Sequence, residues 1–321
     1  MTEFWKAVGG LEAELALVSE RIRVASRSDS RIIDESLSSL LDADGKMLRP
    51  GLLLVASRFG NGAQDKIIAL AASIEMLHVA TLVHDDVIDD SPFRRGLPAV
   101  HARFGKKDAV LVGDYLLSRC FLLASSYTSP ENASRLARAV SVMCVMEIEQ
   151  DMDRYTANPS IRRYLRKILG KTAVLFSLAC HTGATEAKAP APIAARLRRI
   201  GYDIGMAFQI IDDILDYEGA EDEVRKPVGN DLKAGLATLP LICALRNDDG
   251  ALQALVAPGS FPGADPSAII AAVVARGGIQ GARVWAARYT ERALAGIARL
   301  PAGEGRRMME ILTRALLGRR Y

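Results

Sequence analysis

Residues 67–89, IIALAASIEMLHVATLVHDDVID, decide the fold class of this chain. The segment holds no proline and consists mainly of residues that favour a helix. One set of side chains recurs every four residues and so shares a helical face: Ser73, Leu77, Thr81, Asp85 and Asp89. The segment therefore predicts a long helix whose apolar body ends in a run of carboxylates.

A second helix is predicted from about residue 197 to residue 217. Five of its residues share a face: Gly205, Gln209, Asp212, Asp213 and Asp216. The sequence signals of strands are weak, because aromatic residues make up only 6% of the chain and clean alternation is rare. We therefore expect an all-α protein.

The boundaries between elements follow glycine, proline and charge. Stretches rich in these residues predict loops at 91–98, 183–192, 218–238 and 258–266. No change of composition divides the chain into independent halves. The 321 residues are therefore expected to form a single domain over 1–321.

Composition excludes several classes of protein. Half of the residues are apolar and a quarter are charged, which excludes a disordered chain. A formal charge of only +3 argues against a nucleic-acid partner. The four cysteines lie outside metal-binding spacings and indicate thiols of a reducing compartment: Cys120, Cys144, Cys180 and Cys243.

The sequence also predicts a location. No apolar run approaches the roughly 18 residues that a membrane span needs, and the first residues lack the pattern of a signal peptide. A cytoplasmic location is expected.

Two aspartate clusters carry the strongest functional signal. Each has the spacing DDxxD, and together they comprise Asp85, Asp86, Asp89, Asp212, Asp213 and Asp216. On a helix this spacing packs like charges side by side, and the resulting repulsion needs compensation. Mg²⁺ supplies it, because Mg²⁺ prefers oxygen ligands and joins carboxylates to the phosphates of a substrate. A solvated acidic face is the plain alternative, but both clusters adjoin apolar stretches, where carboxylates are rarely unpaired.

Basic residues from several segments complement these clusters. They are Lys46 and Arg49 in GKMLRP, Arg94 and Arg95 in SPFRRG, Lys171 in GKTAVLF, and Lys226 in RKPVGND. A paired arginine suits bidentate contact with phosphate oxygens. Acidic clusters for a metal, together with several cations, indicate a diphosphate site. GKTA is not a nucleotide-binding loop, because the glycine required upstream is missing.

With these motifs, the sequence resembles the trans-prenyltransferases, and within them the octaprenyl and related polyprenyl diphosphate synthases. The matched motifs include GKMLRP, HDDVIDDSPFRRG, GKTAVLF and GMAFQIIDDILDY, and they span about two thirds of the chain. The resemblance implies the isoprenoid synthase fold, a bundle of ten or more helices around a deep cavity, as a homodimer. It also implies that isopentenyl diphosphate condenses with an allylic diphosphate.

The resemblance assigns roles residue by residue. Asp85, Asp86 and Asp89 bind Mg²⁺ and the allylic diphosphate, which Arg94 also contacts. Asp212, Asp213 and Asp216 hold a further Mg²⁺, for two or three ions in all. Isopentenyl diphosphate is assigned to Lys46, Arg49, His78 and Arg95. Lys171, Thr172 and Gln209 line the reaction centre, and Lys226 adds a diphosphate contact.

One position departs from the family. The family commonly has GKPTLP where this chain has Gly235-Leu236-Ala237-Thr238-Leu239-Pro240, so Leu236 replaces a lysine. Lys233 lies three residues earlier as a candidate substitute. The departure weakens part of the allylic contact set and leaves both metal clusters in place.

The expected mechanism needs no general base from the protein. Mg²⁺ and arginine stabilise the departing diphosphate, and an apolar cavity shields the allylic cation from water. The hydroxyl of Thr172 and the carbonyl of Gln209 are expected to stabilise that cation through their dipoles.

Three residues before the first cluster bear on product length: Leu77, Ala80 and Thr81. Short-chain members often carry aromatic residues at the positions of Ala80 and Thr81, so the resemblance implies products beyond fifteen carbons, with thirty to fifty favoured. Close helix packing is the alternative reason for these small residues. Phe121, or another large side chain on its helix, is a candidate for a deeper floor.

Other functions remain as alternatives. A geranylgeranyl-type synthase is the main one within the class, and a non-catalytic subunit of a heteromeric synthase is another, to which only Leu236 points. A terpene cyclase is disfavoured, since it would carry a different second motif. An apolar product also makes transient contact with a membrane plausible.

Overall fold

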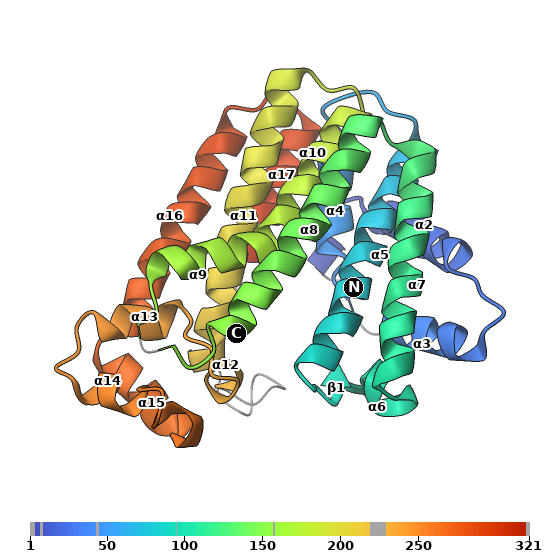
Figure 1. The fold of residues 1–321 in the computed structure, drawn as a ribbon. Helices are drawn as coiled ribbons and strands as arrows, with labels where there is room; N and C mark the ends of the chain where they lie inside the picture. Colours follow the sequence, from blue (N-terminus) through green and yellow to red (C-terminus); the bar gives the residue numbers. More distant parts are fainter. Residues whose placement is uncertain are drawn as a thin grey trace. The chain divides into compact units, whose positions relative to one another are not determined.

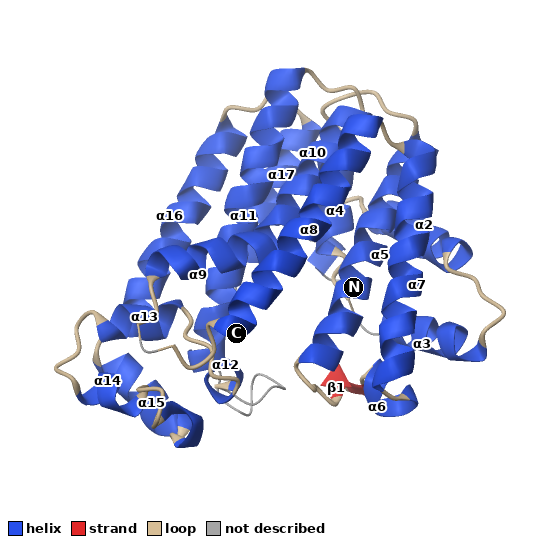
Figure 2. Cartoon of the chain, in the orientation of Figure 1, coloured by secondary structure: helices blue, strands red, loops and turns tan. Residues whose placement is uncertain are grey.

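Helices provide almost all the regular structure of the protein (Figure 2). The computed structural model describes residues 4–6, 9–42, 45–94, 96–156, 158–218 and 229–318. Within these ranges there are sixteen α-helices and one antiparallel hairpin, formed by β1 (Phe93–Arg94) and β2 (Leu97–Pro98). The all-α expectation is confirmed.

The helices follow one another along the chain (Figure 1). Their bounds are α2 Glu12–Ala25, α3 Arg31–Asp42, α4 Leu48–Ser57, α5 Gln64–Ile88, α6 Val100–Phe104, α7 Lys106–Tyr127, α8 Pro130–Met152, α9 Ile161–Ile168, α10 Val174–Glu186, α11 Ala191–Glu218, α12 Asn230–Lys233, α13 Leu239–Leu245, α14 Ala251–Leu255, α15 Pro266–Ala275, α16 Gly278–Ala298 and α17 Glu304–Leu317. A π-helical turn, η1, covers Leu169–Ala173, and a 3₁₀ turn, η2, covers Phe261–Gly263.

The chain forms two compact units, each assembled from separate stretches of sequence. The first unit comprises Met1–Leu136, Leu178–Arg198 and Leu300–Leu312. The second comprises Ala137–Ser177, Arg199–Arg299 and Thr313–Tyr321. The expectation of a single domain over 1–321 stays a prediction.

The first unit is built around α5, the helix that the sequence predicts over 67–89. It begins three residues earlier, at Gln64, and most of its side chains are buried against α2, α4 and α7. α7 lies antiparallel to α5: Gly113 faces the ring of His84, and the thiol of Cys120 lies against the backbone of Leu77. A Cβ at Gly113 would lie 2.2 Å from Nε2 of His84, so only glycine allows this approach.

The second unit is built around the C-terminal part of α11 and the pair α13 and α16. Gly205 of α11 allows a close approach to η1, because a Cβ there would lie 2.6 Å from Cα of Ala173. The predicted helix over 197–217 lies inside α11 and is confirmed.

Two predicted loops contain helix that the sequence did not suggest. α10 continues to Glu186, so the first residues of 183–192 are helical. Residues 230–233 form the single turn α12 inside the predicted loop 218–238. Gly183 lies inside α10 and does not end it. The glycine instead allows close packing, because a Cβ at Gly183 would lie 2.2 Å from the carbonyl oxygen of Leu53.

Two helices are long and apolar enough to cross a membrane by length and composition alone, which differs from the expectation that none would be. They are α5 and α7. In the apolar window of α5, 78% of the residues are buried inside the protein, as in the core helix of a globular unit. The corresponding share for α7 is 33%, and its Leu111 and Leu122 are exposed.

Candidate active site

The first aspartate cluster closes the apolar helix α5. Asp85 is half-buried, Asp86 is only 3% exposed, and Asp89 is the exposed residue that ends the helix. Asp85 and Asp89 lie one turn apart on the same face. The cluster thus presents carboxylates at the end of a long buried apolar surface, the arrangement that a charged head on an apolar tail requires.

Arg94 is held against the buried member of this cluster. Its Nε donates to Oδ1 and Oδ2 of Asp86 at 2.9 and 3.1 Å, and its Nη2 also bonds Oδ1. The hairpin β1–β2 carries Arg94 back over the end of α5. A buried carboxylate needs such a partner, and the contact brings the guanidinium to the cluster.

The segment with Lys46 and Arg49 is shaped by a residue near the start of the chain. The indole nitrogen of Trp5 donates to the carbonyl of Lys46 at 2.7 Å. Its ring fills the space beside Gly51, where a Cβ would lie 2.0 Å from the ring. Met47 takes a left-handed conformation, φ 46°, immediately before α4. Strained backbone of this kind clusters at functional sites.

The predicted chain-length residues lie on the same helix as the first cluster. Leu77 and Ala80 are buried, whereas Thr81 and His78 are half-buried, and the Thr81 hydroxyl donates to the His78 carbonyl. Phe121, suggested as a deeper floor, is 36% exposed. The buried large side chain of α7 in this region is Leu116.

The second aspartate cluster ends α11 and carries more contacts. Asp212 is exposed, Asp213 is 6% exposed, and Asp216 is half-buried. Asp213 accepts hydrogen bonds at both oxygens, from the hydroxyl of Tyr164 at 2.6 Å and from Nε2 of Gln209 at 2.8 Å. Asp216 accepts from two backbone amides at the start of α12, those of Asn230 and Asp231, at 3.1 Å each.

Lys171 and Thr172 are brought to α11 by the π-helical turn η1. Thr172 donates to Oε1 of Gln209 at 2.6 Å. The ammonium of Lys171 lies 3.3 Å from Oε2 of Glu147, whose other oxygen accepts from Gln150 at 2.9 Å. π-Helical turns occur often at functional sites. The structure therefore joins Thr172 directly to Gln209 and places the neighbouring Lys171 beside Glu147 of α8.

Carboxyl groups are concentrated around the second cluster. Burial raises the pKa of Asp213 to about 7, although the hydrogen bonds from Tyr164 and Gln209 act in the opposite direction. Burial, followed by the charge of Asp213, raises the pKa of Asp231 well above its usual range. Such a group of carboxylates favours a bound cation.

The donor set fits a divalent cation that also binds substrate. Among the described residues, no group of three or more histidine, cysteine, aspartate or glutamate side chains forms a complete metal cage. Mg²⁺ does not need one, because it keeps waters and takes only one or two carboxylates alongside phosphates. Exposed carboxylates such as Asp89 and Asp212 offer oxygens of this kind.

The sequence analysis gave neither Tyr164 nor Asp231 a role in the site. Tyr164 is among the residues that carry the resemblance to the family, which was its signal in the sequence. Asp231 had no such signal.

Some predicted positions cannot be compared. Arg95 and Lys226 lie outside the described residues. Leu236 is half-buried and its amide donates to the carbonyl of Asp231 at 2.8 Å, while Lys233 is exposed. The two clusters belong to different units, so their joint action, and the roles assigned to their residues, stay predictions.

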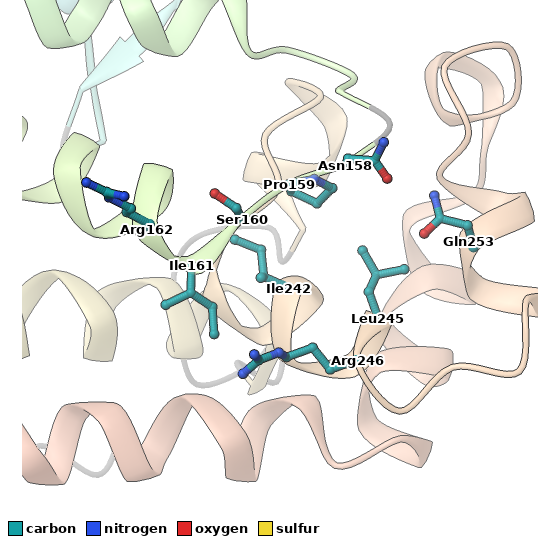
Figure 3. Close-up of a pocket in the computed structure, with 9 residues that line it drawn as sticks. All are labelled: Asn158, Pro159, Ser160, Ile161, Arg162, Ile242, Leu245, Arg246 and Gln253. Carbon is teal, nitrogen blue, oxygen red and sulfur yellow. The ribbon is translucent and has the colours of Figure 1, made fainter.

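A cavity lies elsewhere in the second unit, at the start of α9 (Figure 3). It measures about 410 Å³ and is lined by Asn158, Pro159, Ser160, Ile161, Arg162, Ile242, Leu245, Arg246 and Gln253. None of the predicted site residues lines it. The chemistry predicted from the sequence is therefore not located in this cavity.

Comparison with known proteins identifies the class. Residues 30–260 match the family of polyprenyl synthetases. The chain belongs to this family. It is a prenyltransferase with the isoprenoid synthase fold, a trans-polyprenyl diphosphate synthase.

Individual relatives cover nearly the whole chain. Component 2 of the heptaprenyl diphosphate synthase from Geobacillus stearothermophilus is 38% identical over 303 residues, which is 94% of each chain. The geranyl-diphosphate-specific all-trans-nonaprenyl-diphosphate synthase of Rhodobacter capsulatus is 35% identical over 309 residues, 95% of each chain. A polyprenyl synthase of Caulobacter crescentus CB15, solved with calcium and isoprenyl diphosphate, has a TM-score of 0.92 at 35% identity, covering 99% of this chain and 98% of that one.

Proposed function

We propose that this synthase uses Mg²⁺ to condense isopentenyl diphosphate with an allylic diphosphate into an all-trans polyprenyl diphosphate longer than fifteen carbons. One observation carries the proposal: α5 joins a buried apolar face to a carboxylate cluster within one helix. Such a helix suits a substrate with a charged head and an apolar tail. A calcium ion and isoprenyl diphosphate in a structural relative support the same ligand classes.

The residues divide the task by chemistry. Asp85 and Asp89, with Asp212 and Asp213, would hold two or three Mg²⁺ ions, which supply charge neutralisation to the departing diphosphate. Arg94 would move from Asp86 to phosphate oxygens or bridge both. Lys46, Arg49 and His78 would bind isopentenyl diphosphate, joined by Arg95. Lys171 and Lys226 would add positive charge at the allylic diphosphate.

The length of the product follows from the side chains below Asp85. Ala80 and Thr81 are small, so an apolar tail meets no aromatic barrier at that level of α5. We therefore favour products of thirty to fifty carbons. A geranylgeranyl-type product is the second candidate, and it is supported by a solved synthase of that name from Lactobacillus brevis with a TM-score of 0.92 and 35% identity.

We also propose that the chain works as a homodimer in the cytoplasm and touches membranes only to release product. The exposed Leu111 and Leu122 on α7 support burial against another chain. The name of the Geobacillus relative, component 2 of a synthase, makes a heteromer the alternative. All four cysteines are free, in keeping with a reducing compartment.

The test is a product assay on the purified chain. It is incubated with Mg²⁺, isopentenyl diphosphate and farnesyl diphosphate, and the dephosphorylated products are separated by length. We expect a ladder that ends in one dominant long prenyl alcohol. A ladder that stops at twenty carbons would establish the geranylgeranyl alternative instead.

A purified chain without prenyl transfer activity would also be informative. If farnesyl, geranyl and dimethylallyl primers all fail, the catalytic assignment of the isolated chain is wrong and a subunit role replaces it. Leu236→Lys is then the informative variant, because it restores the lysine found in the family. Recovery of activity in this variant would assign the defect to position 236.

A further inference from the structure

An unbroken chain of hydrogen bonds crosses the second unit at the end of α11. Thr172 bonds Gln209 at 2.6 Å, Gln209 bonds Asp213 at 2.8 Å, and Tyr164 bonds the other oxygen of Asp213 at 2.6 Å. Thr172, Asp213 and Tyr164 are each at most 6% exposed. Hydrogen bonds in such a dry setting fix side-chain orientation strongly.

The direction of every bond in this chain follows from one group. A carboxylate that binds a cation is ionised and only accepts hydrogen bonds, so Gln209 must then present its amide NH₂ to Asp213. The carbonyl of Gln209 then faces Thr172, which must donate its only proton. Tyr164 must donate as well. The charge on Asp213 thus sets the orientation of three neighbouring side chains.

The backbone around these residues is arranged to hold them. Gly205, one turn before Gln209, lets α11 approach η1 so closely that Thr172 and Gln209 meet. On the other side, the N-terminus of α9 is capped by Ser160, which accepts from the amide of Arg163. Tyr164 itself is buried in the hydrophobic core of the unit. The phenol is therefore fixed before any ligand binds.

We propose that Tyr164 is a positioning residue for the divalent cation at the second aspartate cluster. By fixing one oxygen of Asp213 while Gln209 fixes the other, it holds the carboxylate in one rotamer and leaves its remaining lone pairs for the metal. The inference rests on the proposed function only in naming the cation as the one that binds substrate diphosphate.

The same hydrogen bonds change the role expected for Gln209 in the site. Sequence reasoning assigned its carbonyl dipole to the allylic cation, but that oxygen already accepts from Thr172. Gln209 therefore orients Asp213 through its NH₂ group. Thr172, whose proton is committed to Gln209, offers only oxygen lone pairs to any other group, a suitable arrangement beside positive charge.

The test removes one hydroxyl and keeps the ring. Tyr164→Phe is compared with Tyr217→Phe, a matched loss of a buried phenol on α11 whose hydroxyl accepts from Thr238 at 3.2 Å. Binding of Mn²⁺ in the presence of inorganic diphosphate is measured by electron paramagnetic resonance. We expect Tyr164→Phe to weaken Mn²⁺ binding about 10-fold, a typical effect of losing a hydrogen bond to a metal ligand. Tyr217→Phe should leave Mn²⁺ binding unchanged.

Kinetics add a second readout. The Mg²⁺ concentration that gives half-maximal rate should rise in Tyr164→Phe by a similar factor, and excess Mg²⁺ should restore most of the rate. The KM for isopentenyl diphosphate should not change. A merely structural role would lower the unfolding temperature and the maximal rate without moving the Mg²⁺ requirement.

Equal Mn²⁺ affinity in Tyr164→Phe and Tyr217→Phe would overturn the inference. If Tyr164→Phe does not fold, Gln209→Leu removes the opposite donor, and unchanged Mn²⁺ binding in that variant would refute the shared fixing of Asp213. The outcomes also separate the two proposals. Weaker Mn²⁺ binding in a chain without prenyl transfer supports this inference and removes the function, whereas an active chain with unaltered Mn²⁺ binding does the reverse.

Discussion

Asp86 and Arg94 form a close charged contact in the first cluster. The carboxylate is buried and the guanidinium meets it with two nitrogens, so each holds the other in place. Removing one partner of a buried pair leaves an uncompensated charge, which costs about 3–5 kcal/mol. Diphosphate and Mg²⁺ can relieve the pair only by offering each partner a new counter-charge.

Replacing Asp86 with asparagine tests this view. Asp86→Asn keeps the shape but removes the charge, so Arg94 loses its anchor and the cluster loses a carboxylate. We expect the steady-state rate of prenyl transfer to fall at least about 100-fold, the size of losing a positioned electrostatic group. Asp90→Asn is the matched control: this exposed aspartate pairs with Lys106 outside the DDxxD spacing, and its loss should change the rate less than about 3-fold.

Ala80 tests where the product lies. Ala80→Phe puts an aromatic ring on the buried face of α5, so chromatography of the dephosphorylated products should show a shorter dominant chain. Because an oversized buried residue costs about 1–3 kcal/mol, thermal unfolding is measured alongside. Thr81→Phe, at a half-buried position, repeats the test with less strain. A product distribution that neither variant shortens would place the tail elsewhere.

At this scale the sequence predicted the residues but not their contacts. Local spacing is enough to recognise Asp85, Asp86 and Asp89, because a helix fixes which of its own residues are neighbours. The bond between Tyr164 and Asp213 joins residues 49 apart in the chain and depends on how α9 packs on α11. No local pattern carries that information.

At the scale of the elements, Glu186 at the end of α10 links several helices through hydrogen bonds and an ion pair. Glu186 accepts from the Thr128 hydroxyl at 2.6 Å, the Ser129 amide at 3.0 Å and the Asn132 amide group at 2.6 Å, and pairs with Lys66 at 2.5 Å. Burial favours the neutral acid, yet these donors prevail and lower the pKa of Glu186 to about 2. The charge thus ties α5, α8 and α10 together within the first unit.

Acid should therefore loosen this junction. Because the pKa of Glu186 in the folded protein, about 2, lies below its usual value of 4.5, the stabilisation is complete above pH 4.5 and is lost as the pH falls towards 2. Glu186→Gln should destabilise the protein by about 2–3 kcal/mol at pH 7. In thermal melts the difference from wild type should shrink below pH 4.5. Glu131→Gln, an exposed glutamate of α8, should show no such trend.

The helices themselves were largely predictable, and their ends were not. Periodicity and the absence of proline indicated α5 and α11 to within a few residues at their C-terminal ends. The continuation of α10 through Gly183 depended on a packing contact with Leu53 that only the tertiary structure supplies. The turn η1 was not predicted for the same reason, since its close packing against Gly205 of α11 belongs to the tertiary structure.

For the whole molecule, stability and catalysis draw on different forces. Each unit buries an apolar core, such as the one around Ile210 and Leu239 in the second unit. No complete metal cage occurs among the described residues. Helical spacing and composition together indicated an all-α protein with a sizeable core, but the interleaved stretches of the two units could not be predicted from them.

Removal of the metal should separate these forces. Excess EDTA should abolish prenyl transfer and leave the helical circular dichroism signal unchanged, because burial and not ion binding holds the helices. Added Mg²⁺ should restore the rate fully, and added Na⁺ at equal ionic strength should not. A loss of helical signal in EDTA would contradict this expectation and indicate a structural ion.

The indole of Trp5, which packs beside Gly51, also gives the protein an intrinsic fluorescent reporter. The chain has two tryptophans, and Trp5 lies fully buried against the segment with Lys46, whereas Trp285 on α16 is half-buried beside Arg288. Trp285→Phe would leave a single fluorophore that touches the backbone of the proposed isopentenyl diphosphate segment. Any shift of that segment on ligand binding would change its emission, so occupancy could be followed in real time, without turnover and without a label.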